Sequence, residues 1–141
     1  MKRIVLFVMA LGLLATACSD SDDIEAKDYW GRPSPKVATN GAFYVPLHNN
    51  GDADTLIAAS SEACGTVELH QTVMTDGVMA MQEVEGGIEI PAGGDVVMEP
   101  GGLHVMCIDK AVDFTHGTKI ELTLDFENAD SQTLEIEIRE E

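Results

Sequence analysis

The chain has 141 residues, the length of a single domain. It contains 25 Asp and Glu residues against 8 Lys and Arg, so its formal net charge is −17 at pH 7. Such an acidic surface repels the phosphates of nucleic acids and anionic lipids, which excludes nucleic-acid binding. The sequence has no G-x-S-x-G, H-E-x-x-H or phosphate-loop motif, so we do not expect an enzyme.

The first 17 residues have the three parts of an export signal. Lys2 and Arg3 form a charged region, residues 4–14 are apolar, and residues 15–17 are a small-residue cleavage site. The apolar run is much shorter than the roughly 20 residues that a membrane-spanning helix needs. We therefore predict an exported protein, either periplasmic or anchored to a membrane and facing the periplasm or the extracellular side.

Cys18 stands where a bacterial lipobox requires its cysteine, so it is a candidate for lipidation. The small residues before it would also serve an ordinary signal peptidase, and this alternative stays open. Residues 18–27 are polar and acidic, which predicts a flexible tether in front of a domain that spans residues 28–141. Loss of Lys2 and Arg3 with the signal leaves 6 basic and 25 acidic residues, a net charge of −19.

From residue 28 onward, short runs rich in β-branched residues alternate with turn residues every eight to twelve positions, the spacing of a β-sandwich or barrel. Strands are predicted at residues 42–48, 55–60, 66–70, 78–84, 88–90, 95–98, 104–109, 119–126 and 133–139. Apolar and polar residues alternate in the last two, so one face of that hairpin is buried and the other solvated. The sequence predicts one all-β domain.

Residues 67–106 hold five of the seven Met and two of the four His residues. Imidazole and thioether groups together suit Cu(I), because a neutral sulfur donor matches a polarizable ion. Met is also a common filler of hydrophobic cores, so the arrangement has to decide between the two roles. His104 and Met106 are two residues apart in a predicted strand and point to the same face. Predicted turns bring His70 and Met81 to the same end of the fold.

The spacing of His70, Met81, His104 and Met106 resembles the H-x10-M-x22-H-x-M pattern of the periplasmic copper chaperones of the PCuAC family. Other segments that resemble the family are residues 29–33, 40–44, 49–52, 84–94 and 100–104. The resemblance covers roughly residues 28–138. Many family members carry a further Met beside the first His, whereas here Gln71 follows, so a fifth ligand stays open.

This resemblance implies a cupredoxin-like Greek-key sandwich that binds Cu(I) through the four residues of the pattern. It also implies that the ion passes to an acceptor, such as the copper centre of cytochrome c oxidase or another copper chaperone. We further expect a monomer whose contact with a membrane is made through a lipid on Cys18. A copper storage or resistance protein, or an exported interaction module without metal, remains an alternative.

Met79 shares a strand face with Met81 by alternation, and Met74 lies nearby, so each is either an auxiliary ligand or a packing residue. Met98 lies in an apolar run and is expected in the core. His48 and His116 precede turn residues, which predicts that both are solvent-facing loop residues.

Cys64 and Cys107 are a candidate disulfide, because an exported compartment permits one. Cys107 as a thiolate ligand and two free buried thiols are the alternatives. Alternation places Cys107 on the face opposite to His104 and Met106, which argues against a thiolate ligand. No His or Met occurs in the eight residues after Cys107, so a blue-copper electron-transfer site is poorly supported.

Overall fold

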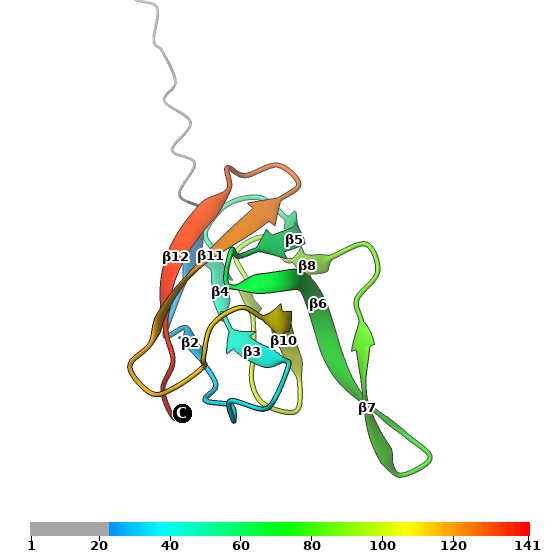
Figure 1. Cartoon of the computed structure of the whole chain (residues 1–141). Coiled ribbons are helices and arrows are strands. Elements are labelled where there is room, and N and C mark those ends of the chain that lie inside the picture. The colour runs from blue at the N-terminus through cyan, green and yellow to red at the C-terminus, as the bar shows by residue number, and fades with distance from the viewer. Residues whose placement is uncertain (1–22) are drawn as a thin grey trace, which may run out of the picture.

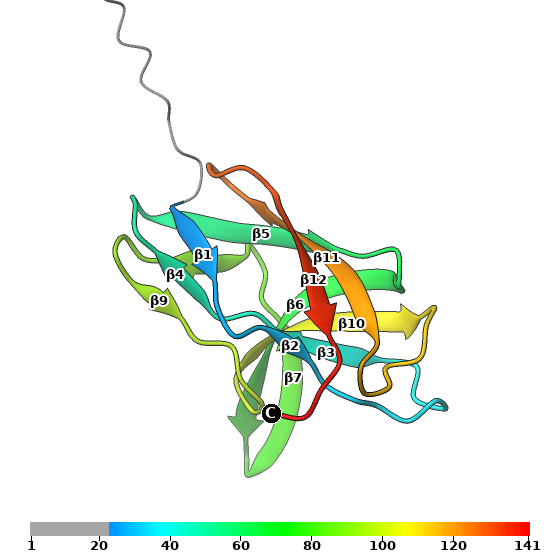
Figure 2. The same cartoon turned by 90° about the vertical axis from the view of Figure 1, so that its left-hand side faces the viewer.

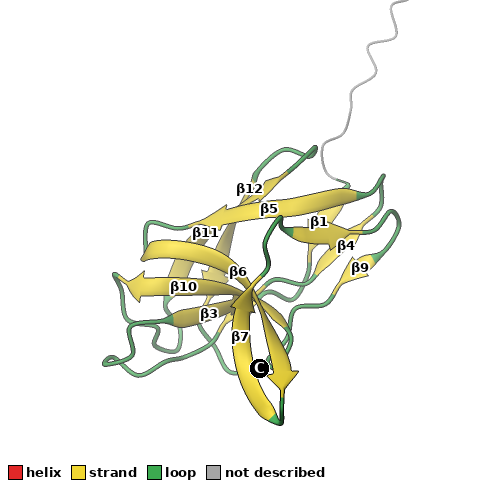
Figure 3. Cartoon of the chain, turned by 90° about the vertical axis from the view of Figure 1, so that its right-hand side faces the viewer, coloured by secondary structure: helices red, strands yellow, loops and turns green. Residues whose placement is uncertain are grey.

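The computed structural model describes residues 23–141, so the predicted export signal and Cys18 lie outside the described part. Within it the chain forms strands and loops and no helix (Figure 3). None of the described residues belongs to a helix long and apolar enough to cross a membrane. The all-β prediction is confirmed.

The strands pair into three antiparallel sheets. The five-stranded sheet has the order β2 (Trp30–Gly31), β3 (Gly41–Tyr44), β10 (Leu103–Lys110), β6 (Cys64–Thr75), β7 (Val78–Glu83). The four-stranded sheet has the order β12 (Gln132–Glu137), β11 (Lys119–Phe126), β5 (Asp54–Ser60), β8 (Ile88–Ile90). The three-stranded sheet has the order β1 (Ile24–Ala26), β4 (Leu47–Asn49), β9 (Asp95–Val96), and lies at one end of the molecule (Figure 2). Neighbours such as β3 and β10 are distant in sequence, so the chain crosses between sheets as it does in Greek-key sandwiches.

The hydrophobic core lies between the inner faces of the sheets. Ile120, Leu122 and Leu124 of β11 are buried, while the residues between them face outward, as the alternation predicted. From the five-stranded sheet, Phe43 is fully buried and packs on Phe114, with ring centroids 5.2 Å apart. The inner face of this sheet therefore builds the core, and its outer face is left free for other functions.

Most predicted strand boundaries differ from the structure by one or two residues, and two predicted strands differ by more. The strand predicted at residues 42–48 is two strands, β3 and β4, interrupted at Pro46. Proline has no backbone N–H to donate to a ladder, which is the physical reason for the break. Strand β6 continues to Thr75 instead of ending at His70, and it forms a long hairpin with β7 that projects from the body (Figure 1).

The predicted tether is wrong over Ile24–Ala26, because these residues form β1 and pair with β4. Ile24 is only 3% exposed, and its carbonyl oxygen accepts a hydrogen bond of 2.7 Å from Nε2 of Gln132. Burial of this one apolar side chain and pairing with a distant strand outweigh the polar character of its neighbours. The folded domain thus begins before residue 28.

Candidate metal centre

His70 on β6 and His104 on β10 are direct partners across the two strands. Their rings lie edge to face, with centroids 5.8 Å apart and planes at 63°. On the opposite face of the same strands, Leu69 and Val105 are buried in the core. His104 is nevertheless only 2% exposed, because its ring lies between His70 and Tyr44, whose centroid is 6.2 Å away. The ladder therefore brings the two predicted imidazole ligands into contact.

One nitrogen of each ring is held by a hydrogen-bond acceptor. Nε2 of His70 lies 2.7 Å from Oε2 of Glu68, and Nδ1 of His104 lies 3.1 Å from the carbonyl oxygen of Gly102. A carboxylate and a carbonyl only accept, so these two nitrogens carry the protons. The other two nitrogens, Nδ1 of His70 and Nε2 of His104, then present lone pairs.

Both of these lone-pair nitrogens are buried, and neither has a hydrogen-bond partner among the described residues. A buried polar atom without a partner costs about 1–3 kcal/mol, so such atoms are rare in folded proteins. Metal-binding histidines commonly donate one N–H to a carboxylate or carbonyl and use the other nitrogen for the metal. The His70–His104 pair has this arrangement twice.

The pKa of His104 is lowered from its ordinary value. Burial is the main cause, because it disfavours the charged imidazolium, and the neighbouring His70 acts in the same direction. The hydrogen bond to the carbonyl of Gly102 opposes both effects without cancelling them. His104 is therefore neutral at pH 7, and a neutral imidazole is the form that binds a metal.

Two predicted thioether ligands lie on either side of the histidine pair. Met106 follows His104 by two residues on the same face of β10, opposite Glu68, and is half-buried. Met81 on β7 is opposite Thr72, which is two residues beyond His70 on β6. Met81 lines a pocket of 190 Å³ that is shared with Met79 and His104. The four residues of the pattern thus occupy one face of neighbouring strands.

The remaining sulfur residues are placed elsewhere. Cys64 and Cys107 form a disulfide with Cα atoms 5.4 Å apart, so Cys107 has no thiolate to offer. Met98 is 2% exposed and belongs to the core, as expected. Met74 pairs with Met79 farther out on the β6–β7 hairpin.

The other two histidines are not part of this face. His116 is exposed in a turn, as predicted. The prediction of a loop position for His48 is wrong, because it lies in β4, half-buried, with Nδ1 2.7 Å from Oδ1 of Asp95 and Nε2 3.1 Å from Oδ1 of Asn50.

The described residues include no group of three or more His, Cys, Asp or Glu side chains that could hold a metal ion. The donors beside the His70–His104 pair are the thioethers of Met81 and Met106 and the carboxylates of Glu68 and Glu83, of which Glu68 is engaged with His70.

The sequence reasoning missed Glu68 and Tyr44, which support the imidazoles. Glu68 could have been found, because it precedes His70 by two residues in an alternating strand and so shares its face. Tyr44 could not, because its place beside His104 depends on the pairing of β3 with β10.

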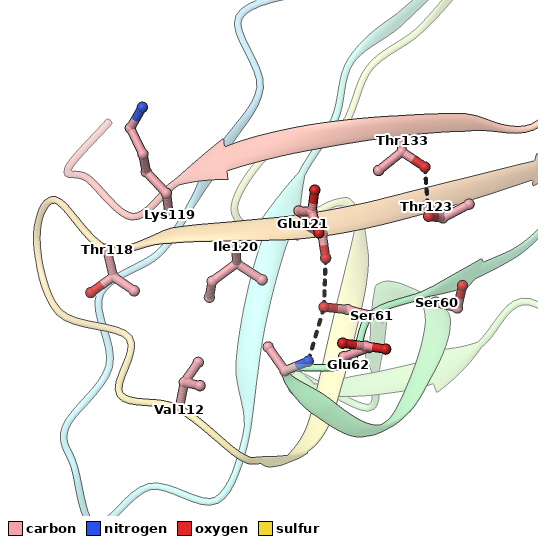
Figure 4. A pocket seen from close by; sticks show the side chains of 11 residues that line it. Ser60, Ser61, Glu62, Val112, Thr118, Lys119, Ile120, Glu121, Thr123 and Thr133 are labelled. Atoms are coloured by element: carbon pink, nitrogen blue, oxygen red, sulfur yellow. Dashed lines mark hydrogen bonds between the residues drawn. The ribbon is translucent and has the colours of Figure 1, made fainter.

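A larger groove of 890 Å³ lies on another part of the surface, between β11 and the turn from β5 to β6 (Figure 4). It shares no residue with the histidine face, and its lining contains hydroxyl groups, carboxylates and Lys119. Oγ of Ser61 donates a hydrogen bond of 2.6 Å to the carbonyl oxygen of Glu121 and accepts one of 3.2 Å from the N–H of Ala63. This groove offers no soft donor.

Comparison with known proteins shows the family of the chain. Residues 24–138 match the family described as "Putative lipoprotein LpqE-like". The chain belongs to the LpqE-like family. One relative of this LpqE-like chain is the "Putative lipoprotein Lxx21020" of Leifsonia xyli subsp. xyli (strain CTCB07), 27% identical over 126 residues that cover 89% of the chain and 75% of the relative.

Solved structures agree with the LpqE-like assignment. The apo PCuAC domain from PmoF1 superposes with a TM-score of 0.70 at 25% identity, covering 84% of the chain and 95% of that domain. The copper-bound PCuAC domain from PmoF2 gives a TM-score of 0.70 at 26% identity, with coverage of 84% and 94%. The predicted relationship to the PCuAC family and the predicted cupredoxin-like fold are confirmed.

Proposed function

We propose that this LpqE-like protein is a Cu(I) carrier that works outside the cytoplasm. Nδ1 of His70 and Nε2 of His104 supply nitrogen ligands, and Met81 and Met106 supply thioether ligands. The observation that carries the proposal is the presence of two buried ring nitrogens without partners in adjacent rings. A bound ion satisfies both at once. The similar PCuAC domain from PmoF2 is a copper-bound protein, which supports the choice of metal.

The donor set favours Cu(I) over harder ions. Two neutral imidazoles and two neutral thioethers suit a polarizable monovalent ion, whereas Ca²⁺ and Mg²⁺ prefer oxygen ligands. Thioethers have no proton to lose and form no disulfides, so the site stays usable in an oxidising compartment. Oxidation of methionine to the sulfoxide is its weakness.

Transfer proceeds by ligand exchange in this proposal. Met81 is 58% exposed, so a ligand of an acceptor protein can approach the ion from the side of β7. The copper–sulfur bond to Met81 breaks as a bond to the acceptor forms, while the buried histidines hold the ion until the exchange is complete. No free ion is released, and no catalytic step is involved.

We further propose delivery to the copper centre of cytochrome c oxidase or to another copper chaperone, as the resemblance to PCuAC proteins implies. The exposure of Met81 favours delivery over storage. Export by residues 1–17 and a lipid on Cys18 would hold the monomer at a membrane. The similar Leifsonia protein is described as a lipoprotein in its own name, which supports this part of the proposal.

A competition titration tests the copper site. Residues 19–141 are titrated with Cu(I) against a chromophoric chelator, together with the variant His70→Ala/His104→Ala. We expect the parent to take up a tightly bound equivalent that the variant loses. The matched control is His48→Ala/His116→Ala, which removes the same number of imidazoles elsewhere and is expected to bind like the parent. Equal competition by all three proteins would overturn the proposal.

Mixing the copper-loaded protein with the isolated copper domain of an oxidase separates delivery from storage. Delivery predicts that copper reaches this acceptor faster than it reaches the chelator. Equal rates would show that copper only dissociates, as expected of a storage protein.

A further inference from the structure

Three methionines lie on the outside of the molecule, where packing does not explain them. Met74, Met79 and Met81 are 66%, 62% and 58% exposed. All three belong to the β6–β7 hairpin, which stands out from the body in both Figure 1 and Figure 3. Met98, a core methionine of the same chain, is 2% exposed. A role other than core packing is therefore needed for these three.

The register of the hairpin gathers their thioethers on one face. Met74 and Met79 are direct partners across β6 and β7, and Met81 follows Met79 by two residues. Side chains directly opposite on such a pair have Cβ atoms about 4.5–5.5 Å apart, and residues two apart on a strand share a face. The unbranched side chain of Met has three rotatable bonds, so the sulfurs of Met74 and Met79 can meet at one ion.

This face continues into the histidine pair. Thr72, the partner of Met81, lies two residues from His70 on β6. Met79 and Met81 line the same 190 Å³ pocket as His104. Met79 therefore connects the histidine pocket with the hairpin tip, because it lines the pocket and is also the cross-strand partner of Met74.

The charge of the hairpin favours a cation. Residues 64–83 contain no Lys or Arg, while Asp76 lies in the turn and Glu83 shares the face of Met79 and Met81. Arg32 lines the pocket beside His104, so a positive charge lies at the histidine end and not at the tip. The whole chain carries a formal charge of −17. A monovalent metal ion approaching the hairpin therefore meets a negative potential, which raises its local concentration.

We infer that Met74 and Met79 form a second soft-metal site, which takes Cu(I) or Ag(I) through thioether ligands alone, while Met81 belongs to the histidine site and lies between the two. Its role is that of a relay, which passes the ion to the histidine pair, and this role rests on the proposed function. The binding of metal at the second site does not depend on that function. In the relay, the copper–sulfur bond to Met74 breaks as a copper–nitrogen bond to His104 forms, with Met79 and Met81 holding the ion between. Every ligand is neutral, so neither a proton nor an electron is transferred.

The test uses residues 19–141 with ¹³C-labelled methionine methyl groups, titrated with Ag(I), a redox-stable probe of Cu(I) sites. The parent is expected to bind two equivalents. In the variant His70→Ala/His104→Ala, the methyl resonances of Met74 and Met79 are expected to shift during the first equivalent added. The resonance of the core residue Met98 is expected to stay in place.

Met74→Leu/Met79→Leu is expected to lose the outer equivalent and keep the inner one, because Leu preserves apolar volume without sulfur. The matched control is Val78→Leu, an exposed change on the same hairpin that removes no sulfur, and it should keep both equivalents. If the Met74 and Met79 methyls stay still while those of Met81 and Met106 shift, the second site does not exist and the copper carrier stands. If the Met74 and Met79 methyls shift but the histidine variant binds as much metal as the parent, the second site stands and the proposed carrier function fails.

Discussion

Strand β6 has two halves with different surroundings. From Cys64 to Gln71 it is paired with β10, and the Cys64–Cys107 disulfide joins the two strands. From Val73 to Thr75 it is paired with β7 alone, and every residue of β7 is exposed. His70 lies on the first half, opposite His104 of β10, and Met74 lies on the second half, opposite Met79 of β7. In the proposed function, the first half is a fixed part that retains an ion, and the second is an open part that exchanges it.

The two halves also differ in what holds their side chains in place. Around His70 and His104, hydrogen bonds to Glu68 and Gly102 set the ring orientations. On the hairpin no such bond orients a thioether, and a two-stranded ribbon that lacks a packed face is only marginally stable. We therefore expect high affinity at the first half and fast exchange at the second. If this division holds, a change in one half should leave the other half unaffected.

The largest effect is expected from removing the disulfide. Cys64→Ala/Cys107→Ala opens a loop closed over a separation of 43 residues. The chain-entropy model gives a loss of about 4 kcal/mol in the free energy of unfolding. Urea denaturation of the variant and of the oxidised parent measures this loss.

The control for this variant is the parent treated with a reductant, which should lose similar stability without any substitution. The methyl resonances of Met74 and Met79 should be unchanged in the folded variant, because the open half does not depend on this bond. A loss below about 1 kcal/mol would show that the disulfide does not fix the first half.

The next effect concerns the carboxylate that orients His70. In Glu68→Ala the hydrogen bond to Nε2 is lost, and removal of such an outer partner commonly lowers metal affinity by about 10- to 100-fold. Competition against a Cu(I) chelator measures the change. Glu83→Ala is the matched control, because Glu83 is the partner of His70 on β7 and has no hydrogen bond to its ring among the described contacts. Equal losses in both variants would point to general surface charge as the cause.

Asp54 lies on β5, outside both halves of β6, and its substitution tests a separate contribution to the stability of the fold. Its buried carboxylate accepts hydrogen bonds from the backbone N–H groups of Thr55, Asn128 and Ala129 and from the Asn128 side chain. Burial by itself raises the pKa of Asp54, but these four hydrogen bonds outweigh it, and the pKa lies below its ordinary value. The folded state therefore favours the charged form more than the unfolded state does.

The sign of the pH dependence follows from this lowered pKa. Stabilisation by Asp54 is complete above the unfolded pKa of about 3.9 and disappears as the pH falls through the lower folded pKa. Asp54→Asn should lose about 1.5 kcal/mol of unfolding free energy at pH 7. This deficit should shrink below about pH 4 in urea denaturation series, with Cu(I) binding at pH 7 unchanged. A loss of unfolding free energy that stays constant with pH would mean that Asp54→Asn acts through altered packing and not through the lost charge.

Much of the fold could be predicted because its signals are local. Alternation along residues 119–126 identified the buried face of β11, and the two-residue spacing of His104 and Met106 placed both on one face. Strands β1 and β2 were missed because they have three and two residues, and their stability comes from partners distant in sequence. No local pattern reports such a partner.

The four candidate ligands could be named from the sequence, but their exposure and their neighbours in space could not. The spacing pattern predicted His70 and His104 together, and the ladder of β6 with β10 brings them into contact. The exposure of Met79 and Met81 could not be predicted, because it depends on β7 being the edge strand of the sheet. Alternation fixes which residues share a face, whereas only the full topology decides whether another layer covers that face.

The smallest effect is expected at the tip of the hairpin. Asp76 and Gly77 have positive φ values of 51° and 76°, as the two-residue turns of tight hairpins require. A Cβ added at Gly77 meets nothing within 4 Å, so Gly77→Ala is resisted only by the left-handed backbone, at a cost on the order of 1 kcal/mol. Amide hydrogen exchange should then speed up at Val73 and Ala80, whose N–H groups face the partner strand of the hairpin, and stay unchanged at His70, whose N–H faces β10. Faster exchange at His70 as well would mean that β6 opens as one unit, and the division into a fixed and an open half would be wrong.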